Sequence, residues 1–196
     1  IIFVRLYVDE EEATVQRVWQ QRLTKRLDAA SEILAQYADV RFSVIGYGTW
    51  QSDGRIQDLG RSLREFEQEV DTGKARIAIG FSSQYKFQSG RNHLGGTRGP
   101  MRSHILIREN APSVLDPERL EVLVHELGHF LGAAHSGVAT SAMRPVVGDG
   151  QPRAASFRIG IDPLNARIMQ KVVREMRDRN VDRFQDLSPH TLVQLR

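Results

Sequence analysis

The segment that most constrains this sequence holds three of its six histidines within eleven residues. His125 and His129 are four residues apart, which on a helix places them one turn apart on the same face. Gly132 comes three residues later, where a helix commonly ends in a left-handed conformation that glycine adopts at little cost. The chain can turn there and bring His135 back toward the other two. This spacing predicts a metal site on a helix that ends at Gly132.

The type of ligand indicates both the metal and the kind of site. Two imidazole nitrogens one helical turn apart can reach a single ion at about 2.0–2.1 Å, the distance at which histidine binds zinc. Three protein ligands leave a fourth position for water, as in catalytic zinc sites, whereas structural sites close all four. Glu126 leaves the helix about 100° away from His125, so it can reach such a water without being a ligand. We therefore predict zinc bound by His125, His129 and His135, with Glu126 as general base.

The residues before the histidines predict the helix that carries them. Asp116, Pro117 and Glu118 indicate an N-cap, a proline at the first helical position and an acid at the positive end of the helix dipole. Apolar residues then recur at intervals of three and four and predict one buried face, formed by Leu120, Leu123, Val124, Leu127 and Leu131. The alternative, that the histidines are ordinary residues of a buried helix, is disfavoured by Gly132 and His135.

The run from His125 to His135 resembles the signature of the metzincin metallopeptidases, HExxHxxGxxH, which a methionine-containing turn follows. Met143 lies eight residues after the third histidine, Ser136 follows that histidine directly, and Pro145 comes two residues after the methionine. These features resemble the matrixin branch. The resemblance implies that Met143 lies beneath the metal as an apolar floor and is not itself a ligand.

The resemblance also implies an α+β fold of the metzincin-like zincin type, in which a mixed, twisted sheet covers the zinc helix. The hydrophobic patterns agree with this order of elements. They predict strands over 1–8, 40–45, 75–81 and 103–108, helices over 10–37 and 59–70, the zinc helix, a turn-rich stretch over 137–160 and a last helix from Asp162. A length of 196 residues, with 40% apolar residues and no convincing linker, predicts a single catalytic domain over 1–196.

In the family that this sequence resembles, an edge strand above the cleft binds extended substrate by backbone pairing. Gly95, Gly96 and Thr97 are the candidates for this edge by their order along the chain, and glycines let a substrate backbone approach closely. An ordinary loop there is an equally open interpretation. Pro145 and Val146 belong to the loop expected to shape the pocket for the residue after the scissile bond. The valine suggests an apolar lining.

The sequence departs from the matrixin pattern in two places. Arg144 precedes Pro145, although matrixins usually have aromatic residues flanking this proline. Matrixins also bind a second, structural zinc in an Asp- and His-rich loop, but the stretch 87–108 has only His93 and His104 and no aspartate. Two histidines without a carboxylate partner are more typical of polar surface residues. We therefore predict one catalytic zinc and no second structural zinc.

Composition excludes several classes of protein. The chain contains no run of about 18 apolar residues, so we expect no membrane span. It has no cysteine and therefore no disulfide. Its pI is near 9.5, but the arginines are spread along the chain and form no basic run, so we expect no nucleic-acid partner. We expect a monomer with a polypeptide substrate, and the family resemblance implies a secreted or cell-envelope location.

The combined pattern predicts a zinc-dependent endopeptidase that hydrolyses peptide bonds with a zinc-activated water and Glu126 as general base. Two alternatives stay open. The same chemistry could hydrolyse another amide or an ester, or the domain could be a non-catalytic, metal-stabilised binding module. Glu126 disfavours the binding module, because such a module could lose this residue without losing the metal.

Overall fold

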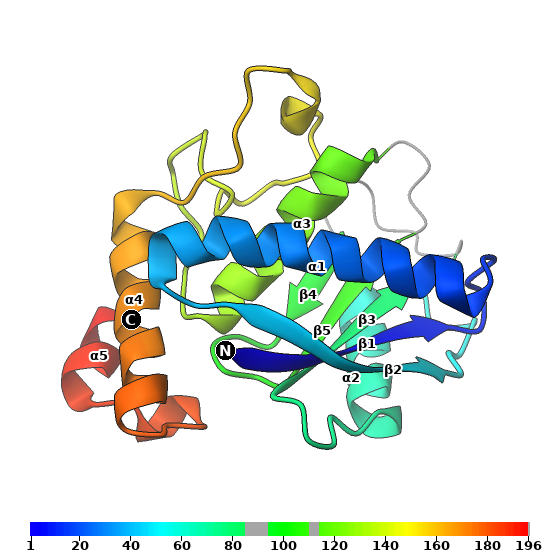
Figure 1. The fold of residues 1–196 in the computed structure, drawn as a ribbon, viewed down its shortest axis with the longest axis horizontal. Coiled ribbons are helices and arrows are strands. Elements are labelled where there is room, and N and C mark those ends of the chain that lie inside the picture. The colour runs from blue at the N-terminus through cyan, green and yellow to red at the C-terminus, as the bar shows by residue number, and fades with distance from the viewer. Residues whose placement is uncertain (85–93, 110–113, 196) are drawn as a thin grey trace.

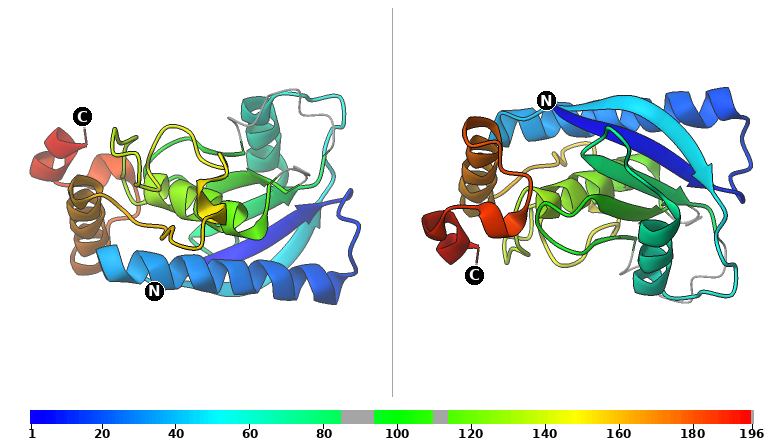
Figure 2. Two further views of the ribbon diagram at one scale, coloured as in Figure 1. Left: turned by 90° about the horizontal axis from the view of Figure 1, so that it is seen from above. Right: turned by 90° about the horizontal axis from the view of Figure 1, so that it is seen from below.

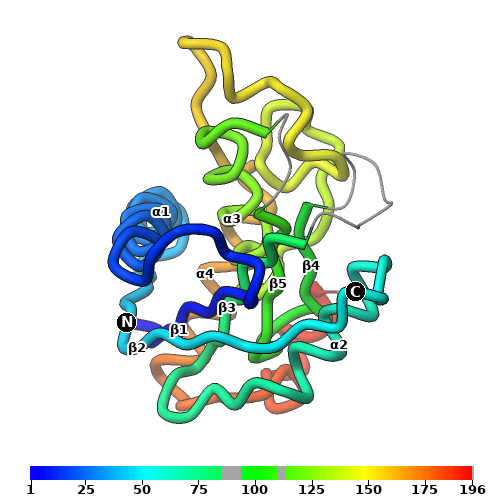
Figure 3. The backbone as a smooth tube through the Cα atoms, turned by 90° about the vertical axis from the view of Figure 1, so that its right-hand side faces the viewer, coloured from blue at the N-terminus to red at the C-terminus, as the bar shows by residue number. Residues whose placement is uncertain are grey.

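A computed structural model describes residues 1–84, 94–109 and 114–195 of the chain. At its centre is a five-stranded sheet in the order β2-β1-β3-β5-β4 (Figure 3). The strands are β1 (Ile2–Asp9), β2 (Phe42–Trp50), β3 (Ile77–Ser82), β4 (Gly95–Thr97) and β5 (His104–Arg108). β4 runs antiparallel to β5, and the other neighbouring strands are parallel. The predicted mixed sheet of an α+β fold is confirmed.

Helices cover both faces of this sheet (Figure 1, Figure 2). The helices are α1 (Gln16–Ala38), α2 (Leu59–Glu69), α3 (Asp116–Phe130), α4 (Pro163–Asp178) and α5 (Pro189–Gln194), with 3-10 turns at Gln151–Arg153 and Phe184–Asp186. Successive side chains of a strand point to opposite faces. In β3, Ile77 and Ile79 pack with the apolar side chains of α1 and α3, whereas Ala78 packs with those of α2. None of the helices described is long and apolar enough to cross a membrane.

Strand β2 extends beyond the predicted 40–45 and includes Gly46 and Gly48. Its residues pair with β1 as far as Trp50, with a register shift beside Val4. The ring of Tyr7 lies against the backbone of Gly48, because a Cβ at this position would be only 2.4 Å from the ring. A glycine in a strand commonly marks such a close approach. The glycines therefore permit the strand to continue and do not end it.

Two helices, α1 and α5, also differ from the sequence prediction. Helix α1 begins at Gln16 and not at Glu10, because the carboxylate of Glu12 accepts hydrogen bonds from the backbone and hydroxyl of Thr14. Such local bonds compete with helix formation. The short helix α5 follows α4 and was not predicted. Only one of its six residues, Thr191, is buried, so it has almost no apolar periodicity to detect.

The carboxylate of Asp9 is buried at the end of β1. It accepts hydrogen bonds from Ser82 Oγ at 2.6 Å and from the backbone N–H of Ser83 at 2.9 Å. These bonds connect the end of β1 to the end of the neighbouring strand β3. Burial raises the pKa of Asp9 to about 6 against the lowering effect of the two hydrogen bonds, and the nearby charges of Glu10 and Glu11 raise it further.

This buried carboxyl group makes stability depend on pH. Because its pKa is higher in the folded state, Asp9 binds more protons there than in the unfolded chain. Its contribution to the free energy of unfolding is complete below the ordinary pKa of 3.8 and is lost as the pH rises through 6, by about 3 kcal/mol at most. Urea unfolding of the wild type and Asp9→Asn should show a stability difference that changes by this amount between pH 4 and pH 7. A constant difference would contradict the raised pKa.

Candidate metal centre

Helix α3 carries the first two histidines. Leu115, and not the predicted Asp116, occupies the position before its first turn. The backbone N–H of Leu115 donates to the carboxylate of Glu118 at 2.9 Å, so the glutamate satisfies a group that the helix itself leaves free. The predicted apolar face is confirmed, and its fully buried members are Leu123, Val124, Leu127 and Leu131.

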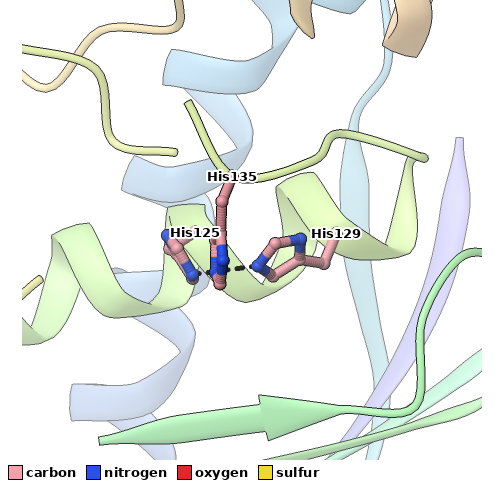
Figure 4. Close-up of side chains that lie close together, drawn as sticks. All are labelled: His125, His129 and His135. Atoms are coloured by element: carbon pink, nitrogen blue, oxygen red, sulfur yellow. Dashed lines mark hydrogen bonds between the residues drawn. The ribbon is translucent and has the colours of Figure 1, made fainter. Parts of the chain in front are cut away.

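The helix ends at Gly132, as predicted. This glycine has a φ of +93°, in the left-handed region that residues with a Cβ rarely adopt. Space is also restricted, because a Cβ here would lie 3.0 Å from both Val172 of α4 and Leu195. Beyond this bend the chain returns along the helix, and His135 comes back to the first two histidines (Figure 4).

The three predicted ligands lie together. His125, His129 and His135 each offer a ring nitrogen, and these nitrogens are within 4.8 Å of one another. His125 is buried, His129 is half-buried and His135 is exposed, so the cluster opens to solvent on the side of the third histidine. Within residues 1–84, 94–109 and 114–195, no other group of three or more His, Asp or Glu side chains could hold a metal ion.

Backbone carbonyls orient the first two rings. His125 Nδ1 lies 2.6 Å from Ala142 O, and His129 Nδ1 lies 2.8 Å from Ala133 O. A carbonyl oxygen only accepts hydrogen bonds, so each Nδ1 must carry the proton and donate it. In a neutral imidazole the lone pair is then on Nε2, which is the atom that a metal binds.

The Nε2 atoms of His125 and His129 are arranged to bind a cation. The Nε2 atoms of His125 and His129 are 2.9 Å apart, and with both protons on Nδ1 neither Nε2 can donate to the other. Burial lowers the pKa of His125 to about 4, with the charge of the neighbouring His129 as the second cause, and burial also lowers the pKa of His129. Both rings are therefore neutral near pH 7. Their converging lone pairs, with that of His135, form a nitrogen donor set that suits zinc.

Glu126 is buried beside this cluster. Burial raises the pKa of its carboxyl group to about 8. The edge strand β4 lies directly against it, since a Cβ on Gly95 would be 2.7 Å from Glu126 Cγ and from Oε1. The glycine therefore allows β4 to approach the glutamate as closely as it does. The structure thus brings together the candidate base and one of the three edge-strand residues expected to bind substrate.

Met143 is completely buried and packs against α3. A Cβ on Gly128 would lie 2.5 Å from its Sδ, so the glycine makes room for the sulfur on the helix that carries the first two histidines. The neighbouring residue, Ala142, supplies the carbonyl that orients His125. This placement supports the expected apolar floor.

Comparison with known proteins assigns the family. The family described as Matrixin matches residues 18–165, which is well over half of the chain. The chain belongs to the matrixin family. The family and the histidine cluster together support a zinc metallopeptidase, which is a hydrolase.

Solved structures share the fold of this matrixin. Archaemetzincin from Methanopyrus kandleri has a TM-score of 0.56 at 15% sequence identity, covering 88% of this chain and 96% of that chain. A chain in a structure described as a chaperone–substrate complex has a TM-score of 0.55, also at 15% identity. That comparison covers 87% of this chain but only 34% of the other. No curated protein sequence matches.

The loop after the methionine is docked on the start of the edge strand. Gly148 has a φ of +72°, and a Cβ there would lie 2.1 Å from Leu94 Cδ1, just before β4. Pro145 and Val146 are exposed in the same loop. The loop and β4 are therefore neighbours in this matrixin, while contact of Pro145 and Val146 with substrate stays a prediction.

Of the two histidines that precede α3, the structure describes only His104. His104 Nε2 lies 2.8 Å from Val70 O, its Nδ1 lies 3.1 Å from Ser103 Oγ, and its ring packs edge-on against Phe66. Both of its nitrogens therefore have protein partners. His93 lies outside the described residues.

Arg144 joins three segments of this matrixin. Its guanidinium donates to the two carboxylate oxygens of Glu121 at 2.6 and 2.9 Å, and to those of Asp149 at 2.9 and 3.2 Å. Glu121 is completely buried and lies one turn before His125 on α3. Burial raises the pKa of Glu121, and the bonds to Arg144 oppose that rise. In the sequence, Arg144 is visible only as a departure from the family pattern. The sequence feature that could have indicated its partner is Glu121, an acid four residues before His125 on the helix.

Removing Arg144 should leave the Glu121 carboxylate buried without its partner, at a cost of about 3–5 kcal/mol in the free energy of unfolding. Urea denaturation of Arg144→Met should measure this loss. The double variant with Glu121→Leu should recover most of it, because an apolar pair needs no charge compensation. Arg61→Met, at an exposed position on α2, is the matched control. Equal losses in the single and double variants would show that the unpaired charge of Glu121 is not the cause of the loss.

Proposed function

We propose that this matrixin is a zinc-dependent endopeptidase with Glu126 as its general base. The observation that carries the proposal is the position of β4. The backbone of Gly95 lies against Glu126, which directly follows the first of the three converging histidines. A polypeptide paired with this strand would therefore pass over the candidate base and metal ligands.

His125, His129 and His135 would hold a single catalytic zinc through their ring nitrogens. When bound, zinc supplies a Lewis acid for a carbonyl oxygen and lowers the pKa of water at its open position to about 7. The hydrogen bonds from His125 to Ala142 O and from His129 to Ala133 O keep these rings aligned for it.

Glu126 has the surroundings of a group that both takes and returns a proton. Burial raises its pKa to about 8, and a cation held by the histidines would bring that pKa down toward neutrality. A carboxyl group that titrates near the working pH can accept a proton from the attacking water. It can then deliver the proton to the departing amine. Exclusion of water by β4 strengthens these electrostatic effects.

Backbone groups of β4 are available to a polypeptide. The backbone N–H of Arg108 donates to the carbonyl oxygen of Leu94. These two residues lie directly opposite each other in the antiparallel register of β4 and β5. Because inward and outward residues alternate in such a pair, Gly95 and Thr97 direct their N–H and C=O groups away from β5. In the part of the chain that the structure describes, β4 is the last strand of the sheet. Recognition of an extended main chain by strand addition favours a polypeptide over a small amide or ester.

Replacing Glu126 by alanine should remove the proton acceptor and leave the three ring nitrogens in place. We expect casein cleavage by the zinc-loaded protein to fall by about 10²–10⁴-fold, with unchanged zinc content by mass spectrometry. Glu69→Ala, at an exposed position at the end of α2, is the matched control and should cleave as the wild type does. Wild-type turnover in Glu126→Ala would show that the base is another group.

The wild type should bind one zinc per chain after dialysis, and a chelator should abolish cleavage. Zinc at about 100 times its dissociation constant should stabilise the fold by about 2.7 kcal/mol, measured as a rise in melting temperature. His129→Ala should lose both the zinc and this rise, whereas His190→Ala, at an exposed position on α5, should keep them. Zinc content that is insensitive to His129→Ala would contradict the site. Cleavage of small esters without cleavage of casein would favour another hydrolase.

A further inference from the structure

A cavity of about 420 Å³ lies beside the edge strand, between β4 and the first turns of α2. Its apolar wall is formed by Leu59 and Leu63, which belong to the cluster on the α2 face of the sheet. Figure 3 shows α2 next to β4 at this edge of the molecule. The histidines and Glu126 belong to the other face, against which α3 packs. The cavity is therefore separate from the metal centre although it borders the same strand.

The two glycines of β4 face these two sides. A Cβ on Gly95 would lie 2.7 Å from Glu126, whereas a Cβ on Gly96 would lie 3.6 Å from Leu59 and 4.0 Å from Leu63. Directly opposed residues of paired strands place their side chains on the same face of the sheet. A peptide residue opposite Gly95 would thus face Glu126. The adjacent residue, opposite Gly96, would face the cavity.

Resting on the proposed endopeptidase function, we infer that this cavity is a specificity subsite for one apolar side chain of the substrate. The occupant is the side chain opposite Gly96. Because Gly96 has no side chain, the way from the edge strand to Leu59 and Leu63 is open. A side chain that enters there would exchange water for the apolar surface of these two leucines.

The rim of the cavity carries charges of both signs. Arg98 Nε donates to both carboxylate oxygens of Glu67, at 2.6 and 2.8 Å. Asp58 caps α2 by accepting the backbone N–H of Arg61, and its charge is opposite to that of Arg64 on the same rim. Neither sign of charge dominates the rim, and the wall opposite Gly96 is formed by Leu59 and Leu63, so the subsite selects for apolar character.

The test uses zinc-loaded protein and quenched fluorescent peptides in which one leucine is moved through an alanine-based sequence, with the cleaved bond mapped by mass spectrometry. At one position the wild type should have a kcat/KM about 10-fold higher for leucine than for alanine. Gly96→Val, whose side chain would occupy the cavity, should bring this ratio close to 1 at that position and leave the ratios at other positions unchanged. Gly54→Val is the matched control, because a Cβ there meets nothing within 4 Å.

A reciprocal variant keeps the inference open to refutation if Gly96→Val folds poorly. Leu63→Ala enlarges the cavity and should shift the preference at the same position from leucine toward phenylalanine, with folding checked by melting temperature. Fluorescence anisotropy of the same peptides on zinc-loaded Glu126→Ala should show the leucine preference as tighter binding, without turnover. A leucine preference unaffected by both cavity variants, or a preference for an acidic residue, would overturn the subsite alone. A wild type that neither cleaves nor binds these peptides would overturn the endopeptidase function as well.

Discussion

Two hydrogen bonds, from His125 Nδ1 to Ala142 O and from His129 Nδ1 to Ala133 O, hold the two helical imidazoles in the orientation that a metal needs. Both acceptors belong to segments that follow α3, one in the bend after the helix and one beside Met143. The helix alone therefore places the rings on one face but does not fix their rotation or their tautomer. The geometry of the site is complete only when these later segments have packed against the helix.

Arg144 explains how the turn around Met143 is kept in register with α3. Its guanidinium reaches the buried Glu121 on the helix and Asp149 in the following loop, so one side chain spans all three segments. The same loop contacts Leu94 at the start of β4 through Gly148. A continuous set of contacts thus leads from the metal ligands to the edge strand β4.

The parts of the molecule that local patterns govern could be predicted from the sequence. The apolar spacing along α3 and the glycine at position 132 predicted the helix and its end, and the resemblance to the metzincins implied the mixed sheet. Predictions failed where a distant partner decides the conformation. Strand β2 continues past residue 45 because the ring of Tyr7 packs on Gly48, and the burial of Arg144 against Glu121 was not predicted at all. Neither partner is near in sequence, so no periodicity records the contact.

The bend at Gly132 depends on a part of the molecule that the family match does not reach. That match ends at residue 165, yet the bend packs against Ile168 and Val172 of α4 and against Leu195. His135, the most exposed of the three histidines, comes directly after this bend. The third ligand thus follows a bend that packs against a segment outside the matched residues. Repacking of α4 against this bend would therefore move His135 relative to the other two histidines without any change in the histidine motif itself.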